Sequence, residues 1–162
     1  IKRALLVDED AKFAEHDGFD WAGMQHAWEK NLKKGKIVAG GSTISQQLAK
    51  NLFLSSSRTP WRKAEEALIT VMLETFLDKQ RIFELYLNVI EWGNGLFGVE
   101  AAARKYYHVH ASQLGPSQAA QLAAMVTNPR YYQTHRSDRR LQRKASIILQ
   151  RMRQADLPQP GQ

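Results

Sequence analysis

Apolar residues recur every three or four positions over residues 21–34, the spacing that places side chains on one face of an α-helix. Asp20 is a suitable N-cap for this helix, and Gly35 is a suitable end. The apolar face carries Trp21, Met24, Trp28 and Leu32. We expect this face to pack in the core. The alternative is a helix lying on an anionic membrane surface, because lysines crowd its far end. They are Lys30, Lys33, Lys34 and Lys36.

A second long helix is predicted to begin at Thr59 and Pro60, as N-cap and first helical residue. Its apolar positions are again spaced for one face. We expect these to be the buried side: Ala64, Leu68, Val71, Met72 and Thr75.

Start and stop signals predict four further helices in the second half of the chain. Asp78 caps one that ends at the turn-forming residues 93–95, and an alanine-rich helix covers residues 101–107. Gly115 with Pro116 begins another, and Ser137 caps a basic helix that ends near residue 156. No run alternates with the period of a strand. The sequence therefore predicts an all-α, predominantly helical fold with one domain over residues 1–156, an irregular stretch over 35–42 and a flexible tail over 157–162.

Residues 40–51 combine a glycine pair with a helix start rich in polar groups. Thr43 is a suitable N-cap, and Gln46 three residues later completes a capping box. This arrangement suits an anion-handling site, which Lys50 approaches as a point charge from the far end of the helix. The structural alternative is a glycine turn before an ordinary surface helix. Three residues are expected to face the core, namely Ile44, Leu48 and Leu52.

Composition narrows the classes of function. The 162 residues suit one domain with a genuine core. The net charge of +7 and the pI near 9.8 favour a polyanionic partner without choosing among nucleic acid, lipid headgroups and phosphorylated substrates. The absence of cysteine excludes disulfides, thiolate metal sites and cysteine nucleophiles. No apolar run approaches the length of a membrane span.

Residues 9–20 form an acidic and aromatic segment in which Glu9 is the candidate general base. Phe13 would desolvate the Glu9 carboxylate, and the neighbouring acids Asp8 and Asp10 would repel its charge, which suits a general base. The alternative is a solvated acidic loop. We interpret His16 as a structural hydrogen-bonding residue, because no second histidine lies at metal-ligand spacing.

A cationic set around residues 50–63 is the second candidate for chemistry. It consists of Lys50, Arg58, Arg62 and Lys63. Such groups can stabilise a departing diphosphate, although a solvated basic face is the ordinary alternative. Glu66 and Glu74 lie two turns apart on the predicted helix and either pair with Arg62 and Lys63 or face a cleft.

Taken together, three segments resemble family 51 glycosyltransferases, the peptidoglycan polymerases, and above all their monofunctional members. The first comprises Glu9, Asp10, Phe13, His16, Gly18, Phe19 and Asp20. The second is the whole of residues 40–51, and it is highly specific. The third comprises Arg62, Lys63, Glu66, Leu73 and Glu74, followed by residues 82–88 and 91–103. The resemblance runs from about Leu6 to Tyr132.

The resemblance implies a lysozyme-like helical domain that polymerises lipid II at the outer, periplasmic face of the bacterial cytoplasmic membrane, with inversion to a β-1,4 link. It implies that Glu9 is the general base and that Lys50 and Arg58 bind the diphosphate. Glu66 would be the second essential glutamate, which holds a divalent cation (Mg²⁺ or Mn²⁺) or assists at the donor. The other implied substrate-binding residues are Ser42, Thr43, Gln46, Gln47 and Arg62. Those implied to support the site are Asp10, Phe13, His16 and Gly18.

The implied partners are lipid II, the growing glycan chain, an anionic membrane surface and cell-wall synthesis proteins, with no nucleic acid. Two features depart from the family pattern: an acidic Asp8 stands where a small or uncharged residue is expected, and these residues hold no N-terminal membrane anchor. Two other functions remain open. One is a muramidase that cleaves finished glycan, and the other is a non-enzymatic domain that binds nucleic acid through the arginine-rich segment 136–153.

Overall fold

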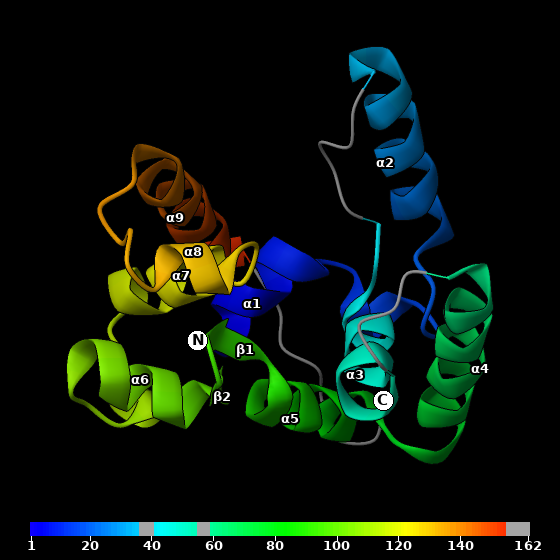
Figure 1. The fold of residues 1–162 in the computed structure, drawn as a ribbon, viewed down its shortest axis with the longest axis horizontal. Helices are drawn as coiled ribbons and strands as arrows, with labels where there is room; N and C mark the ends of the chain where they lie inside the picture. Colours follow the sequence, from blue (N-terminus) through cyan, green and yellow to red (C-terminus); the bar gives the residue numbers. More distant parts are fainter. Residues whose placement is uncertain (36–40, 55–58, 155–162) are drawn as a thin grey trace.

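The computed structural model describes residues 1–35, 41–54 and 59–154. The fold is predominantly helical, as predicted (Figure 1). The longer helices are α1 (Lys2–Glu9), α2 (Trp21–Lys34), α3 (Ile44–Phe53), α4 (Pro60–Phe76), α5 (Lys79–Val89), α6 (Val99–Tyr107), α7 (Pro116–Met125) and α9 (Arg139–Arg151). The short elements are α8 (Pro129–Tyr132), η1 (Phe13–Glu15), η2 (Ala111–Gln113), η3 (Met152–Gln154), β1 (Glu91–Gly93) and β2 (Leu96–Phe97). The predicted tail lies outside the described residues, and the one-domain boundary stays a prediction.

Helix α1 lies at the centre of the molecule and packs against α7 and α9, whereas α3 packs against α4 and α5 (Figure 1). Helix α2 projects from the rest of the fold, next to the side that carries α3 and α4. The core includes side chains from α1, α3, α5 and α7, with Leu5, Ile44 and Tyr86 fully buried. The C-terminal end of α1 therefore lies where the two groups of helices meet.

Side-chain caps fix most of the predicted helix starts. Asp20, Thr43, Thr59 and Asp78 each accept a hydrogen bond from the backbone N–H three residues later, as expected for N-caps. The prediction for the last long helix was wrong by one position. Asp138, not Ser137, caps α9, because its carboxylate accepts from the Arg140 N–H at 2.7 Å.

Two elements were not predicted from the sequence. Residues 2–9 form α1, so Glu9 lies at the end of a helix. Residues 91–97 form a small antiparallel hairpin, β1–β2, that the sequence did not predict. Strands of three and two residues are too short to show alternation. The turn signal at 93–95 marked the right place, since Gly95 has a φ of +71°.

The apolar faces of α2 and α4 are exposed, which contradicts the prediction that both pack in the core. Trp21, Trp28 and Leu32 of α2 are each at least 64% exposed, and Leu68 of α4 is also 64% exposed. The side of α4 that faces the protein instead carries the buried Glu66 and Thr70. The helical periodicity was predicted correctly, but an apolar face along a helix does not show whether another part of the protein packs against it.

Candidate functional site

A cavity of about 380 Å³ opens where the end of α1, the start of α2 and residues 41–43 meet. Its lining residues come from three segments that are separate in the sequence. They are Val7, Asp8, Glu9, Asp10, Ala11, Asp20, Gly23, Met24, His26, Gly41, Ser42 and Thr43. The cavity therefore brings the first motif, including Glu9, together with the start of the second.

The Glu9 carboxylate is held from α3. Gln47 donates from Nε2 to Glu9 Oε2 at 2.8 Å, and the Tyr86 hydroxyl donates to Gln47 Oε1 at 3.1 Å. Because the Tyr86 hydroxyl donates to the amide oxygen, it orients the Gln47 amide with its NH₂ group towards Glu9. Burial raises the pKa of Tyr86 well above its usual value, and the nearby Glu9, Asp8 and Asp10 raise it further. Tyr86 therefore remains a neutral donor at physiological pH.

Asp10 connects the end of α1 to the start of α3. Its carboxylate accepts a hydrogen bond from the Ile44 N–H at 3.1 Å and lies 3.0 Å from His16 Nε2. A carboxylate at a helix N-terminus is favoured by the helix dipole and by the free N–H groups. The prediction that His16 is structural agrees with this contact. Asp10 and His16 thus support the site by fixing the backbone that carries Glu9.

The loop between α1 and α2 lies tightly against α3 and α4. Gly18 has a φ of +87°, and a Cβ atom there would come within 2.8 Å of Thr70 Cγ2. The Thr43 hydroxyl donates to the Gly18 carbonyl at 2.6 Å. Phe13 is 1% exposed and contacts Phe83, with ring centroids 5.8 Å apart. Gly18 and Phe13 therefore fix the loop, and Phe13 does so without lining the cavity.

The second motif forms the capping box that the sequence predicts. Gln46 Oε1 accepts from the Thr43 N–H at 2.9 Å, and Thr43 Oγ1 accepts from the Gln46 N–H at 3.3 Å. Gln46 is 3% exposed. Both side chains thus hydrogen-bond within the protein, and their contact with substrate stays a prediction. Ser42 is exposed and lines the cavity. Ile44 and Leu48 face the core as expected, but Leu52 is 39% exposed.

Among the described residues, the cationic side chains predicted to bind diphosphate lie outside the cavity that Glu9 lines. Lys50 is exposed and lies three residues beyond Gln47, hence one turn along the same side of α3. Arg62 Nη1 lies 3.3 Å from Glu66 Oε2, and Lys63 Nζ pairs with Glu66 Oε1. Neither Lys50 nor this group lines the cavity. Arg58 lies outside the described residues.

The sequence did not single out three of the features that shape the site. Tyr86 was included in the resembling segment 82–88 but was given no role at the site, and α2, which lines the cavity with Met24 and His26, was not expected to contribute to it. The third is Lys144, which lies 2.8 Å from Asp8 Oδ2. These contacts join segments far apart in the sequence, so spacing could not reveal them.

A helical domain with a carboxylate held over a cavity, next to a capped helix that carries a lysine, has the parts of a glycosyl-transferring enzyme. The sequence profile described as Transglycosylase matches residues 1–153, and the chain belongs to this family.

Similar proteins carry a common name, biosynthetic peptidoglycan transglycosylase. The chain is 72% identical to one from Laribacter hongkongensis over 158 residues, which cover 98% of this chain and 69% of the relative. It is 70% identical to one from Chromobacterium violaceum, with the same coverage. It is 68% identical to one from Methylobacillus flagellatus, again over 98% and 69%.

Proposed function

We propose that this domain, a peptidoglycan glycosyltransferase by family, polymerises lipid II into β-1,4-linked glycan at the outer face of the bacterial cytoplasmic membrane. The growing glycan chain would be the donor and lipid II the acceptor. The observation that carries the proposal is the placement of Glu9: its carboxylate lines the cavity and is oriented by Gln47.

In the proposed reaction, Glu9 removes the proton from the 4-hydroxyl of the acceptor sugar. The hydroxyl oxygen then bonds to the anomeric carbon of the donor. The bond from that carbon to the diphosphate breaks, and its electron pair leaves with undecaprenyl diphosphate. Attack from the face opposite the leaving group inverts the anomeric centre. Gln47 supports this role because its hydrogen bond to Oε2 leaves Oε1 for the substrate's proton.

A departing diphosphate needs positive charge instead of a proton donor. We assign this role to Lys50, which is exposed on α3 one turn beyond Gln47. Arg62 is a second candidate, and Arg58 keeps its predicted role as a diphosphate ligand. The predicted roles of Ser42, Thr43, Gln46 and Glu66 at the substrate likewise remain part of the proposal.

The predicted divalent cation finds little support at Glu66. Both carboxylate oxygens of Glu66 face cations, Arg62 and Lys63. Among residues 1–35, 41–54 and 59–154, no three acidic or histidine side chains gather as a metal site. This donor set does not fit Mg²⁺ or Mn²⁺ as arranged, so no step is assigned to a metal. A requirement for a divalent cation stays a prediction that chelation with EDTA would test.

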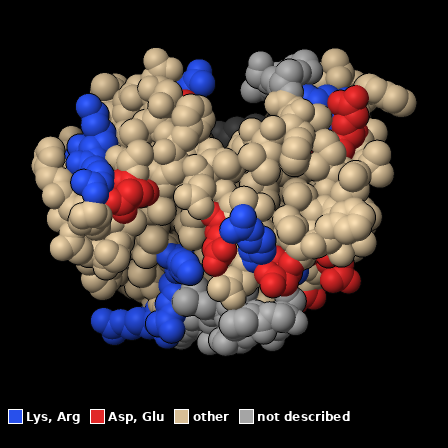
Figure 2. Space-filling model, turned by 90° about the horizontal axis from the view of Figure 1, so that it is seen from below, with Lys and Arg blue, Asp and Glu red and all other residues tan. Residues whose placement is uncertain are grey.

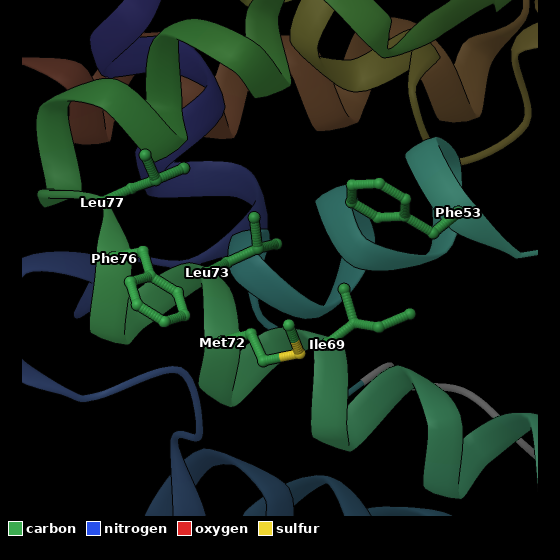
Figure 3. A pocket seen from close by; sticks show the side chains of 6 residues that line it. All are labelled: Phe53, Ile69, Met72, Leu73, Phe76 and Leu77. Carbon is green, nitrogen blue, oxygen red and sulfur yellow. The ribbon is translucent and has the colours of Figure 1, made fainter.

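The exposed apolar side chains of α2, α3 and α4 suit a lipid-linked substrate, and we propose that they lie on the membrane. Phe53 of α3 and five residues of α4 and its end surround an apolar hollow of about 350 Å³ (Figure 3). Wide areas of the face in Figure 2 carry no charged side chain. Exposed tryptophans and the lysines at the end of α2 are typical of a surface that binds anionic lipid. None of the described helices is long and apolar enough to cross a bilayer.

The membrane surface and other cell-wall synthesis proteins are therefore proposed partners. Contact with the membrane surface would give access to a substrate anchored in lipid. The proposal of cell-wall synthesis proteins as partners rests on the name of the relatives, which refers to peptidoglycan synthesis.

The test of the proposed function is polymerisation of lipid II in detergent by the wild-type domain and by Glu9→Gln. The wild type should yield glycan polymer, and Glu9→Gln should lose at least about a hundredfold in rate, the usual contribution of a general base. Glu15→Gln, an exposed site outside the cavity, is the matched control and should keep wild-type activity. A wild type that makes no polymer, but releases soluble muropeptides from sacculi, would establish a muramidase instead.

A further inference from the structure

Asp8 is a buried acid in the cavity that the reaction does not use. Its side chain is 6% exposed, it lines the same cavity as Glu9, and Lys144 Nζ lies 2.8 Å from its Oδ2 atom. This contact is an ion pair. The pair joins the end of α1 to α9, across 136 positions of the sequence.

Lys144 is the cation that balances Asp8. It also donates to Thr127 Oγ1, which fixes its ammonium group between α9 and the end of α7. Helix α7, which packs against α1, contains no acidic, basic or histidine residue. The charge of Glu9 on α1 acts on Asp8, and the charge of Asp8 acts in turn on the neutral Tyr86 of α5. Three further titratable groups line the cavity with Asp8, namely Asp10, Asp20 and His26. Arg153 of η3, which also contacts α1, is exposed.

Burial raises the pKa of Asp8 to about 7, Lys144 opposes this rise, and the neighbouring Glu9 adds to it. A hydrogen bond to the Glu9 carboxylate, available only to the protonated form of Asp8, is a further cause of the raised pKa. Asp8 therefore changes its protonation state near neutral pH, next to the group that must accept the substrate's proton.

We propose that Asp8, kept ionised by Lys144, is a positioning residue for Glu9. As a carboxylate it leaves Glu9 free to accept a proton from the acceptor hydroxyl. As a carboxylic acid it donates a hydrogen bond to Glu9 and blocks that acceptance. When the pH rises, the proton of Asp8 passes to solvent and Glu9 is released. This inference rests on the proposed function of Glu9 as the general base.

The central experiment is the pH–rate profile for polymerisation of lipid II by Lys144→Met. Loss of the opposing cation favours protonated Asp8, so the acid limb of the profile should move up by about one pH unit or more. The rate at a pH on that limb should fall about tenfold. Lys144→Arg keeps the charge and should restore the wild-type limb. Lys105→Met, at an exposed lysine on α6, is the matched control and should leave the limb unchanged.

Two substitutions of Asp8 separate this role from a purely structural one. Asp8→Ala removes the blocking group, so its activity should persist at a lower pH than that of the wild type. Asp8→Asn keeps the shape but directs its amide NH₂ to Glu9, because Lys144 needs the amide oxygen. It should be less active than Asp8→Ala at every pH. A structural role predicts the opposite order, since asparagine is the closer match in shape.

The double variant Asp8→Ala with Lys144→Met completes a double-mutant cycle for this pair. Its acid limb should match that of Asp8→Ala alone, because Lys144 acts through Asp8. The proposal would be overturned if the wild type is active and its acid limb lies at the same pH as those of Lys144→Met and Asp8→Ala.

A readout independent of activity keeps the two proposals separate. Carboxyl ¹³C NMR should show Asp8 titrating near neutral pH in the wild type and at a higher pH in Lys144→Met. If the wild type makes no polymer, the proposed function fails, while this titration still decides whether Lys144 controls Asp8. Titration of Asp8 at an ordinary acidic pH in both proteins would refute the inference. Circular dichroism at the same pH values establishes that each variant is folded.

Discussion

The side chain of Asp10 connects three segments of the chain. Asp10 follows the last residue of α1, its carboxylate accepts a hydrogen bond from the Ile44 N–H of α3, and it pairs with His16. The residue types in this set were identified from the sequence as supporting the site, and their contacts agree with that prediction. Asp8 was noted as an acid near Glu9 and as a departure from the family pattern. Its partner could not be found from spacing, because Lys144 lies on the last long helix. The sequence therefore indicates which residues belong to the site, but it does not indicate which side chains they contact.

The pKa of Asp8 predicts how stability depends on pH. Burial raises this pKa from 3.8 to about 7, so the folded protein binds the proton more tightly than the unfolded chain does between these values. The contribution of Asp8 to the free energy of unfolding should therefore fall as the pH rises from about 4 to about 7, by up to about 4 kcal/mol. Urea unfolding of the wild type and Asp8→Ala at pH 5 and pH 8 measures this. The variant should gain stability relative to the wild type at pH 8.

Asp17→Ala is the matched control for this stability measurement, since Asp17 is exposed. It should not change the pH dependence. An equal difference in stability between the wild type and Asp8→Ala at both pH values would contradict the prediction.

Helix α3 positions several residues of the candidate site relative to Glu9. The capping box fixes the start of the helix, where the N-cap Thr43 lines the cavity and the Ile44 N–H donates to Asp10. Gln47 then falls where it can hold Glu9, and Lys50 follows one turn later. The local signals for this helix were sufficient to predict its start, because capping involves residues three apart.

Thr43→Ala should destabilise the domain by about 1 to 2 kcal/mol, because it removes an N-cap and the hydrogen bond to the Gly18 carbonyl. Urea unfolding measures this loss. Thr43→Ser retains the hydroxyl and should lose much less. A serine variant as unstable as the alanine variant would show that the methyl packing of Thr43, and not its hydroxyl, matters.

The whole molecule exposes apolar faces on one group of helices. Helices α2 and α4 and the end of α3 carry exposed tryptophan, leucine and phenylalanine side chains, and they lie together on one side of the fold (Figure 1). This is the surface that we propose to lie on the membrane.

Replacing Trp61 and Phe76 together by serine should weaken binding to vesicles that contain anionic phospholipid. These side chains are 76% and 77% exposed, so their loss removes apolar contact with lipid but little packing in the protein. Binding measured by co-sedimentation should fall about tenfold or more, with the folded stability nearly unchanged. Phe97→Ser is the control, because Phe97 is 55% exposed on β2, away from α4. Equal vesicle binding by the double variant and the wild type would rule out this face.

The sequence by itself determined the helical class, most helix starts, the capping box and the residue types of the candidate site, because these depend on neighbours a few positions apart. The tertiary structure decided which faces are covered. The stripes of α2 and α4 were correctly located, but the fold turns Glu66 and Thr70 inward and leaves Leu68 and Trp28 exposed. It also decided that Gln47 and Lys144 reach Glu9 and Asp8. Such contacts depend on how distant helices pack, which no periodicity records.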